Sequence, residues 1–479
     1  MGTSLSIPPS LEEEFDVVVV GGGSTGCVVA ARLAEGGARV LLLEAGPSNQ
    51  ERGIRRRVGS PFLQSVQLQT SELSCVYSTV PQEAAGGRAS RWPRGKLLGG
   101  CSSVNQCLYV RGDPRTFDDW ETRLGCQGWG WKSVLKHFKK CEHYHGDGNP
   151  ALRGFDGPIQ VTKAEKRFGL ATREVCELFL AACEAAGIPR VEDYNGETQT
   201  GASVIQATVC QGVRSDAASA YLFDATRAAR LASLRIVTGA CAERIQLEEL
   251  RARGVHFRLK GELKYVRAKE TVVCAGAIGS PQLLMLSGIG PKEHLEAVGL
   301  ECQADLAVGS NLCDHLCFPL RFSWREPLAF NPARQTSTLI SRAQHALGKG
   351  GVYDFPPVGA LCFCQSKVAE SYQDLDPDIP HDPASEQYMR EYVRRYAQTV
   401  YHHSGTCRLG PEGSESVVDL RLRPWGVKQL MVADASVMPY CVSGNINAAC
   451  LMIGEQAATF LLEDHQEFRS DNGEPGASQ

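Results

Sequence analysis

The sequence lacks the features of several protein classes. Its 50 Lys and Arg nearly balance its 54 Asp and Glu, for a formal net charge of -4, so no broad basic face for nucleic acid or an anionic membrane is expected. Gly, Pro or a charged residue interrupts every long apolar stretch, so no transmembrane segment is expected. What remains, at 479 residues and 43% hydrophobic, is an ordinary globular composition with two joined domains.

Zinc-type cysteine spacing is also missing. The chain holds 19 cysteines, but no Cys-x-x-Cys pair recurs at the spacing of a zinc site, so no metal is expected. Several cysteines, such as Cys362, Cys364 and Cys450, lie in apolar runs, as reduced core residues do. This pattern favours the cytoplasm or another reducing intracellular compartment.

The two ends of the sequence carry little targeting information. The first fourteen residues contain three glutamates and no apolar core, so neither a signal peptide nor an arginine-rich transit peptide is expected. Met1 to Ser6 fits a myristoylation pattern, but matches this short usually arise by chance. The tail, 467–479, is largely polar and is expected to be disordered.

The first chemical motif follows a short apolar strand. Phe15 to Val20 runs straight into Gly21-Gly22-Gly23-Ser24-Thr25-Gly26, and an Ala- and Val-rich helix follows to Ala34. The first glycine permits a tight turn, the third lets backbone approach a pyrophosphate, and the last lets the helix pack on the strand. The phosphates would then lie at the helix N-terminus, where free N–H groups favour negative charge.

An acidic residue follows at the spacing that a dinucleotide site requires. A second strand, Arg39 to Leu43, leads into Glu44 and Ala45, and Glu44 lies eighteen residues past Gly26. A carboxylate there can accept hydrogen bonds from an adenosine ribose. Strand, helix and acid together predict dinucleotide binding, against the alternative of a plain glycine-rich turn, but they do not separate FAD from NAD.

A second loop of glycines and hydroxyls, Arg94 to Asn105, resembles the first signature of the glucose–methanol–choline (GMC) oxidoreductases, flavoenzymes that oxidise alcohols. The resemblance implies that FAD is the cofactor and that this loop lies across its pyrophosphate and flavin ring. Cys101 departs from the usual Gly, Ser or Thr. Val104 stands where some members carry a histidine bonded to the flavin, so non-covalent FAD is expected. The implied contacts are Gly99, Gly100, Ser103, Val104 and Asn105.

Two further segments match the family. Gly276 to Gly290 follows the second signature without exception, and Pro281 is expected in the first turn of the helix there. Val308 to His315 reproduces a Gly-x-Asn-Leu-x-Asp-His turn, in which we interpret His315 as structural.

The C-terminal part returns to the cofactor. Asp434 and Ala435, which follow the strand Gln429 to Ala433, resemble a flavin-contacting pair. Further along, a turn leads into a helix that runs to Leu462. The N–H groups at the start of that helix would stabilise the charge of a reduced flavin. The remaining implied contacts are Ala242, at the adenine, and Asn445, Ile446 and Asn447.

Two adjacent histidines provide a base. His402 and His403 follow a strand-like run, Gln398 to Tyr401, and histidine exchanges protons near neutral pH. Members usually show His-Pro here, so the resemblance implies that His402 accepts the hydroxyl proton while hydride leaves the same carbon for flavin N5. Asn445 would hold the oxygen. The alternative is that His402 only satisfies a structural turn.

The resemblance implies an α/β fold: a Rossmann-like FAD-binding domain with a second, antiparallel-sheet substrate domain that is apparently shortened here. The expected cofactor segments are 14–160, 206–316 and 400–466, and the expected substrate segments are 161–205 and 317–399. Members usually carry a block of strands and a helix pair where this chain has only Asp376 to Ala384. A helix from Ser385 to Ala397 follows, with Asp382 expected as its cap. Another helix, Thr172 to Ala186, is expected to bury Leu178, Phe179 and Ala182.

These observations predict an FAD-dependent dehydrogenase or oxidase acting on the CH–OH group of a small-molecule alcohol, with an unidentified electron acceptor. The identity of the alcohol and the oligomeric state stay open. One alternative is a photodecarboxylase-like lyase of the same family, which the resemblance implies would lack the alcohol-oxidising histidine. Another is a catalytically impaired flavin-binding isoform, because the missing block would remove part of the cavity wall.

Overall fold

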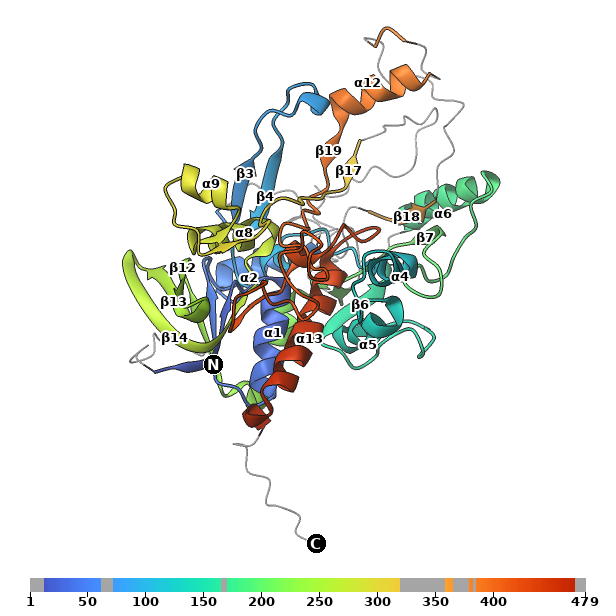
Figure 1. Ribbon diagram of the computed structural model, residues 1–479. Helices are drawn as coiled ribbons and strands as arrows, with labels where there is room; N and C mark the ends of the chain where they lie inside the picture. The colour runs from blue at the N-terminus through green and yellow to red at the C-terminus, as the bar shows by residue number, and fades with distance from the viewer. Residues whose placement is uncertain are drawn as a thin grey trace.

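The structure is a computed structural model that describes residues 13–61, 72–164, 170–318, 358–364, 379–381 and 385–469 (Figure 1). The myristoylation pattern at Met1 to Ser6, most of the tail, Asp382 and most of the expected second substrate segment lie outside these residues.

The core is a parallel sheet with the strand order β11-β2-β1-β14-β20. All six residues of β1 are buried, because helices cover a parallel sheet on both faces and select an uninterrupted apolar run. The chain order reverses between β1 and β14, so their carboxyl ends open a crevice. The strands are β1 (Phe15–Val20), β2 (Val40–Glu44), β11 (Leu234–Thr238), β14 (Glu262–Val273) and β20 (Leu430–Val432).

Strand β14 belongs to two sheets at once. Its C-terminal half pairs in parallel with β1, while its N-terminal half pairs antiparallel with β13 (Arg251–Leu259). β12 (Ala240–Glu248) completes that antiparallel sheet. The antiparallel sheet therefore extends the core to one side, left of α1 in Figure 1.

Two helices from opposite ends of the chain pack together on the parallel sheet. Helix α1 (Ser24–Glu35) lies beside α13 (Asn447–Asp464), as Figure 1 shows. Most of α13 is buried, and its Glu455 carboxylate accepts hydrogen bonds from Arg32 Nε at 2.8 and 2.9 Å and pairs with Lys140 Nζ at 2.8 Å. A buried carboxylate needs such partners, so α13 is tied to α1 and α5 (Trp131–Cys141).

The second region consists of small sheets. β7 (Gly201–Val204) pairs antiparallel with β18 (Ala360–Phe363), and β6 (Ile159–Lys163) lies between β5 (Glu142–Tyr144) and β8 (Gln206–Ala207).

The remaining α-helices and strands of the described residues are α2 (Arg52–Val58), β3 (Ser74–Ser78), β4 (Arg91–Gly95), α4 (Pro114–Thr122), α6 (Leu170–Ala185), β9 (Val209–Cys210), β10 (Val213–Arg214), α7 (Ala217–Tyr221), α8 (Gly276–Leu286), β15 (Ile289–Gly290), α9 (Lys292–Ala297), β16 (Ala304–Asp305), β17 (Leu316–Cys317), α12 (Glu386–Tyr396) and β19 (Gln398–Thr399).

The prediction for the buried face of α6 is wrong. Leu178 and Phe179 are 48% and 42% exposed, and the helix instead buries Cys176, Leu180 and Cys183 against β7 and β18. These three residues are spaced four and three apart and form their own stripe. The error arose because two apolar stripes overlap on this helix and the cysteines were not counted as its core face.

Pro281 is not in the first turn of its helix, because α8 already begins at Gly276. A proline inside a helix leaves the carbonyl four residues earlier without its N–H partner. Here that carbonyl belongs to Ala277, and it accepts a hydrogen bond from Thr406 Oγ1 at 2.7 Å. The proline is therefore accommodated inside the helix, and the carbonyl that it frees binds the segment after His402.

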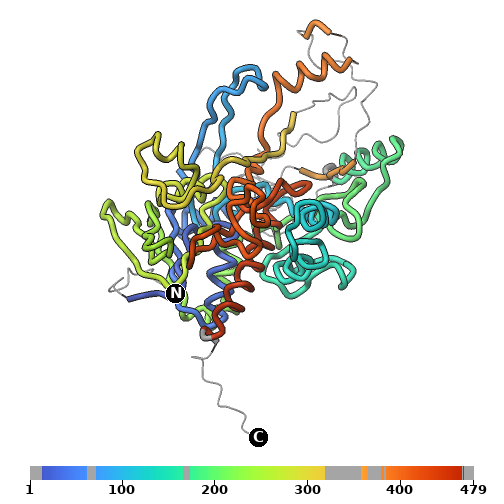
Figure 2. Tube along the Cα trace, in the orientation of Figure 1, coloured from blue at the N-terminus to red at the C-terminus, as the bar shows by residue number. Residues whose placement is uncertain are grey.

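The cap of α12 also differs from the prediction. Ser385 Oγ accepts a hydrogen bond from the Tyr388 amide at 3.1 Å, so Ser385 is the N-cap. The helix packs on the tip of the β3–β4 hairpin, where Arg88 Nη2 donates to the carbonyl oxygens of Arg394 and Ala397 at 2.9 and 3.0 Å. Hairpin and helix rise together from one end of the molecule (Figure 2).

Candidate active site

A cavity of about 820 Å³ opens at the carboxyl ends of β1 and β14, where the chain order of the sheet reverses. Ligands of open α/β sheets bind at this place. Most of the residues predicted from the sequence line it: Gly21, Gly23, Ser24, Thr25, Glu44, Ala45, Gly100, Val104, Asn105, Ala242, His402, Asp434, Ala435, Asn445, Ile446 and Asn447. Gly26, Gly99 and Ser103 are not among the lining residues and pack behind it.

The first glycine loop has no room for side chains. Gly21 has φ +99°, and a Cβ there would lie 2.5 Å from the carbonyl oxygen of Cys274. A Cβ on Gly26 would lie 1.9 Å from the carbonyl oxygen of Gly21, so this glycine lets α1 approach the end of β1. The turn, the helix and β14 can therefore meet only if both positions lack side chains.

The second loop rests on the first. The Gly99 amide donates to the Gly22 carbonyl at 2.7 Å, and a Cβ on Gly100 would lie 2.7 Å from the Cα of Gly23. Ser103 Oγ donates to the Leu98 carbonyl at 2.9 Å and is fully buried. Ser103 and Gly99 thus hold the loop in shape, while its neighbours reach the cavity.

Arg214 anchors the far end of the second loop. Its Nη1 donates to Asn105 Oδ1 at 2.8 Å and to the Asn105 carbonyl at 2.7 Å. The guanidinium is buried, so these bonds fix Asn105 at the cavity wall.

Glu44 lies at the end of β2 with both oxygens occupied. Oε2 accepts from the Gly22 amide at 2.8 Å and Oε1 accepts from the Gly46 amide at 2.7 Å. Burial raises the pKa of this carboxyl above its usual range, against the lowering effect of these amides. Each oxygen still has a second lone pair on the cavity side of the strand, which a ribose hydroxyl could use.

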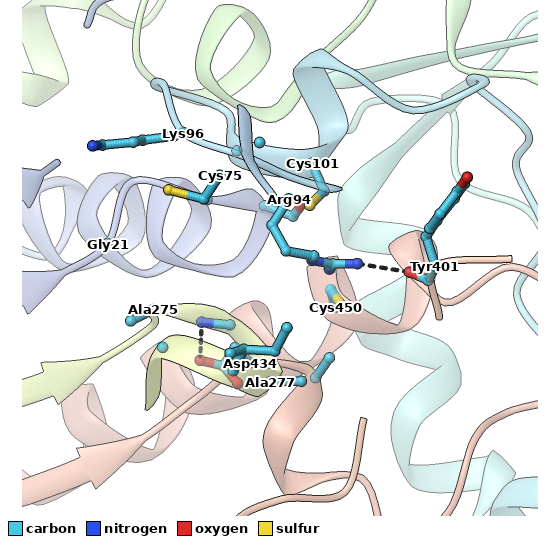
Figure 3. Close-up of a pocket in the computed structure, with 18 of the residues that line it drawn as sticks. Gly21, Cys75, Arg94, Lys96, Cys101, Ala275, Ala277, Tyr401, Asp434 and Cys450 are labelled. Atoms are coloured by element: carbon cyan, nitrogen blue, oxygen red, sulfur yellow. Dashed lines mark hydrogen bonds between the residues drawn. The ribbon is translucent and has the colours of Figure 1, made fainter. Parts of the chain in front are cut away.

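The C-terminal segments close the cavity from the other side of β14. Asp434 Oδ2 accepts from the Gly276 amide at 2.8 Å, so the start of α8 and the end of β20 share one carboxylate (Figure 3). Ser24 Oγ donates to Asn447 Oδ1 at 2.8 Å and joins the first residues of α1 and α13. Two helix N-termini therefore face the same cavity, and neither helix has a side-chain cap.

His402 meets Asn445 at the cavity wall. Asn445 Nδ2 lies 3.2 Å from His402 Nε2, and His402 Nδ1 lies 3.0 Å from His315 Nδ1. An amide nitrogen can only donate, so Nε2 of His402 carries a lone pair and its proton is on Nδ1. His315 Nδ1 accepts the hydrogen bond that His402 Nδ1 donates. In this tautomer the basic nitrogen of His402, Nε2, lies beside Asn445.

The backbone around His402 is fixed by Asp314 and Arg94. Asp314 Oδ1 accepts from the His402 amide at 2.9 Å, and Arg94 Nη1 donates to the carbonyl oxygen of Tyr401 at 2.7 Å (Figure 3). Tyr401 has φ +65°, which is uncommon for a residue with a side chain. The two bonds hold the turn in this conformation.

The pKa of His402 is lowered to about 3, chiefly by burial and in addition by His315 and Arg94. The imidazole is therefore neutral at physiological pH, which is the form that can accept a proton. His403 points elsewhere: its ring lies 4.0 Å from that of Trp92, its Nδ1 is 3.2 Å from Arg94 Nη1, and it is fully buried.

Sequence reasoning missed several residues of this arrangement. It took His315 as part of a structural turn, whereas the ring contacts His402 directly. The adjacent acid and imidazole in Asp314-His315 were the available signal. Arg94 offered none, because an arginine at the start of a loop has no distinctive pattern.

The residues present fit FAD. Glycines remove side chains where the two loops cross, two uncapped helix N-termini provide N–H groups for phosphates, and Glu44 provides a carboxylate for a ribose. The cavity volume, about 820 Å³, lies within the range of about 300–1,000 Å³ usual for ligand pockets. In the described part of the chain, no group of three or more His, Cys, Asp or Glu is arranged to hold a metal ion.

Two models of one family match the chain, over residues 15–317 and 334–454, and both carry the description GMC oxidoreductase. The chain belongs to the GMC oxidoreductase family. It is therefore an FAD-dependent oxidoreductase that acts on CH–OH groups, as the two signatures predicted. The parallel sheet is that of the family's FAD-binding fold, which a second, substrate domain accompanies.

Curated relatives cover nearly the whole chain. An oxygen-dependent choline dehydrogenase of Vibrio vulnificus is 31% identical over 94% of this chain and 95% of its own length, and the mitochondrial choline dehydrogenase of Homo sapiens is 32% identical over 94% and 90%. The alignment with the Vibrio protein spans 543 positions, of which this chain can fill 94% of 479, or about 450. About 90 aligned positions therefore have no residue here, in agreement with a shortened domain.

Solved structures show the same fold. Pyridoxine 4-oxidase from Mesorbium loti superposes with a TM-score of 0.74 at 28% identity, over 93% of this chain and 99% of its own. Formate oxidase from Aspergillus oryzae superposes with a TM-score of 0.80 at 24% identity, over 95% and 99%, which bears on the fold alone. Among the described helices, none combines the length and apolar character needed to cross a membrane.

Proposed function

We propose that the chain oxidises a small alcohol with His402 as the base that accepts the hydroxyl proton. The observation that carries this is the contact between His402 Nε2 and Asn445 Nδ2, 3.2 Å apart in the wall of the cavity. A neutral imidazole with its lone pair on Nε2 can take the proton, and an amide beside it can hold the alcohol oxygen. Because the hydroxyl proton is removed as hydride leaves, the carbonyl product does not have to form in a high-energy protonated state.

Three neighbours prepare His402 for this task. His315 accepts from Nδ1 and keeps the proton off Nε2, Asp314 holds the His402 amide, and Arg94 holds the preceding carbonyl. Such supporting contacts orient a catalytic side chain before the substrate arrives. The FAD bound by the glycine loops would supply the hydride acceptor.

Replacing His402 by alanine tests the proposal. A positioned base contributes about 10²–10⁴-fold, so we expect reduction of the bound flavin by alcohol to slow by that factor while FAD content and folding stay normal. The measurement is anaerobic stopped-flow absorbance with a panel of choline, pyridoxine and benzyl alcohol. A parallel loss of FAD and stability would instead support a purely structural histidine.

His403→Ala is the comparison variant. Because His403 is fully buried against Trp92 and contacts Arg94, we expect it to lower the melting temperature, with a smaller effect on the rate once FAD is bound. An equal, specific loss of rate from His403→Ala would move the assignment away from His402.

The two alternative functions predict different results for the same panel of alcohols. A photodecarboxylase-like lyase would leave the flavin oxidised with every alcohol and act on a fatty acid in light; the presence of both His402 and Asn445 at one wall favours alcohol oxidation. An impaired isoform would bind FAD and stay oxidised as well, without the light reaction. Bleaching of the flavin by any alcohol of the panel separates the first proposal from both.

We propose further that FAD is held without a covalent bond. Val104 lines the cavity where some relatives carry histidine, and its side chain offers no nucleophile. Acid precipitation should then release all the yellow colour into the supernatant. Colour that stays in a washed pellet would contradict this.

The nineteen cysteines are all free thiols in the structure, which supports a reducing compartment.

A further inference from the structure

A clamp of hydrogen bonds holds the turn that carries Asn445. Ser443 Oγ accepts from the Asp113 amide at 2.7 Å and donates to Gln199 Oε1 at 2.7 Å. Gln199 Nε2 donates in turn to the Ser443 carbonyl oxygen at 3.3 Å. Gln199 therefore uses both ends of its amide on a single residue, two positions before Asn445.

The turn is also held on its other side. Gly444 has φ +88°, and a Cβ there would lie 2.7 Å from Val110 Cγ1. The backbone is thus packed against Val110 and bonded to Gln199, and it can move away only if that clamp opens. Asn445 is the next residue, with its Nδ2 3.2 Å from His402 Nε2.

The loop that carries Gln199 is anchored in a buried ionic network. Arg153 Nη1 donates to both oxygens of Asp193 at 2.9 Å, and Glu142 lies between Arg111 and Arg153 at 2.6 and 2.8 Å. The side chains of Glu142, Arg111 and Arg153 are fully buried. Paired charges of this kind fix the elements that bear them, so the loop is a firm base for Gln199, itself 4% exposed.

We propose that Gln199 is a positioning residue for alcohol oxidation: acting through Ser443, it sets where the Asn445 amide lies relative to His402. This inference rests on the function proposed above. Gln199 is not one of the cavity-lining residues, so it acts only through the turn. A misplacement of about 1 Å can cost about 10²-fold in rate, and we expect a loss of about 10–100-fold when the clamp is removed.

The test is a double-mutant cycle on the FAD-loaded protein. Wild type, Gln199→Leu, Asn445→Ala and the double variant are compared by the limiting rate of flavin reduction, with the alcohol of the panel that reduces wild type fastest. We expect Gln199→Leu to lower the limiting rate about 10–100-fold in the wild-type background, and less than about twofold where Asn445 is already alanine. The dissociation constant of the alcohol should change less than the rate.

The outcomes are distinguishable. An equal loss from Gln199→Leu in both backgrounds would overturn the positioning role, because Gln199 would then act independently of Asn445. No loss from Gln199→Leu beside a large loss from Asn445→Ala would overturn it too, and would leave the proposed function standing. No loss from Asn445→Ala would overturn it as well, because Gln199 is proposed to act through Asn445, whereas the role of His402 as the base is decided by His402→Ala.

Two matched variants and one structural readout complete the experiment. Thr198→Val changes the neighbouring side chain, which accepts from the Thr200 amide, and should keep the wild-type rate. Gln199→Glu retains an acceptor for the Ser443 hydroxyl and should restore part of the rate. A crystal structure of Gln199→Leu should show Asn445 displaced from His402, and an unmoved Asn445 would contradict the proposal. If Gln199→Leu does not fold, Ser443→Ala removes the same clamp from its other side.

Discussion

The cofactor side of the cavity and the alcohol side are built in opposite ways. On the cofactor side, what matters in the two glycine loops is backbone without side chains: a Cβ on Gly26 or Gly100 would meet backbone atoms at 1.9 or 2.7 Å. On the alcohol side, the wall depends on contacts between side chains from separate segments, such as His315 with His402 and Gln199 with Ser443.

The difference teaches which kind of site a sequence can disclose. Glycine is required where backbone must approach backbone, so a cofactor loop is visible as a local pattern of residue types. A hydrogen bond between two distant side chains leaves no such pattern. Three predictions test how far this contrast holds, beginning with the largest effect.

Gly26→Ala should abolish FAD binding or folding. The new methyl group would lie 1.9 Å from the Gly21 carbonyl oxygen, and because that neighbour is backbone, the loop can make room only by leaving the shape that holds the cofactor. The measurement is the FAD-to-protein ratio with the free energy of unfolding. Gly53→Ala in α2 is the control: no heavy atom lies within 4 Å of its Cβ position, so the protein should gain about 0.4–1 kcal/mol. Similar behaviour of the two variants would break the contrast.

Arg153→Met should destabilise the protein by about 3–5 kcal/mol, because it leaves the buried Glu142 and the partly exposed Asp193 with fewer cationic partners. This would show that the alcohol side depends on side-chain pairing as strongly as the cofactor side depends on glycine. Arg190→Met, in a more exposed pair with Glu177, should cost at most about 1 kcal/mol. Chemical denaturation of both variants decides, and equal losses would count against the role of the network.

His137→Leu should make stability less sensitive to acid. The pKa of His137 on α5 is lowered to about 4, chiefly by burial and in addition by the charges of Lys136 and Lys140, against a raising effect of Glu455. An unfolded histidine binds its proton near pH 6.5, so the folded protein loses about 1 kcal/mol for each pH unit between 6.5 and 4. The variant should lack that part of the slope in melts at a series of pH values.

The control for His137→Leu is His294→Leu, at an exposed position on α9. It should leave the wild-type slope in place, since His402 and His403 contribute equally to both proteins. A slope unchanged by His137→Leu would mean that its burial does not govern the acid response.

Much of the fold was predictable from the sequence, and for identifiable reasons. The strand Phe15–Val20 was predicted with the bounds that the structure gives, because β-branched runs bounded by glycine or polar residues have few alternatives. The family prediction was confirmed by matches over most of the chain. The segment boundaries between the two domains stay predictions.

The errors have a common physical origin. The buried face of α6 and the place of Pro281 in α8 depend on partners far away in the chain, β18 in one case and Thr406 in the other. The contact of His315 with the ring of His402, 87 residues later, was likewise not predicted. Local propensity describes what a segment can form, whereas distant contacts decide which of its faces is used.

The packing of α1 against α13 has a consequence for how the protein is made. The ribosome completes β1, α1 and β2 within the first tenth of the chain, but the helix that covers α1 begins only at Asn447, and the last strand of the sheet at Leu430. Contacts so distant in sequence form slowly, and apolar surface that waits for them attracts other chains. The nascent N-terminal half therefore needs protection from aggregation until synthesis is complete. A truncated transcript that ends before α13 would yield a chain that cannot bury its first helix.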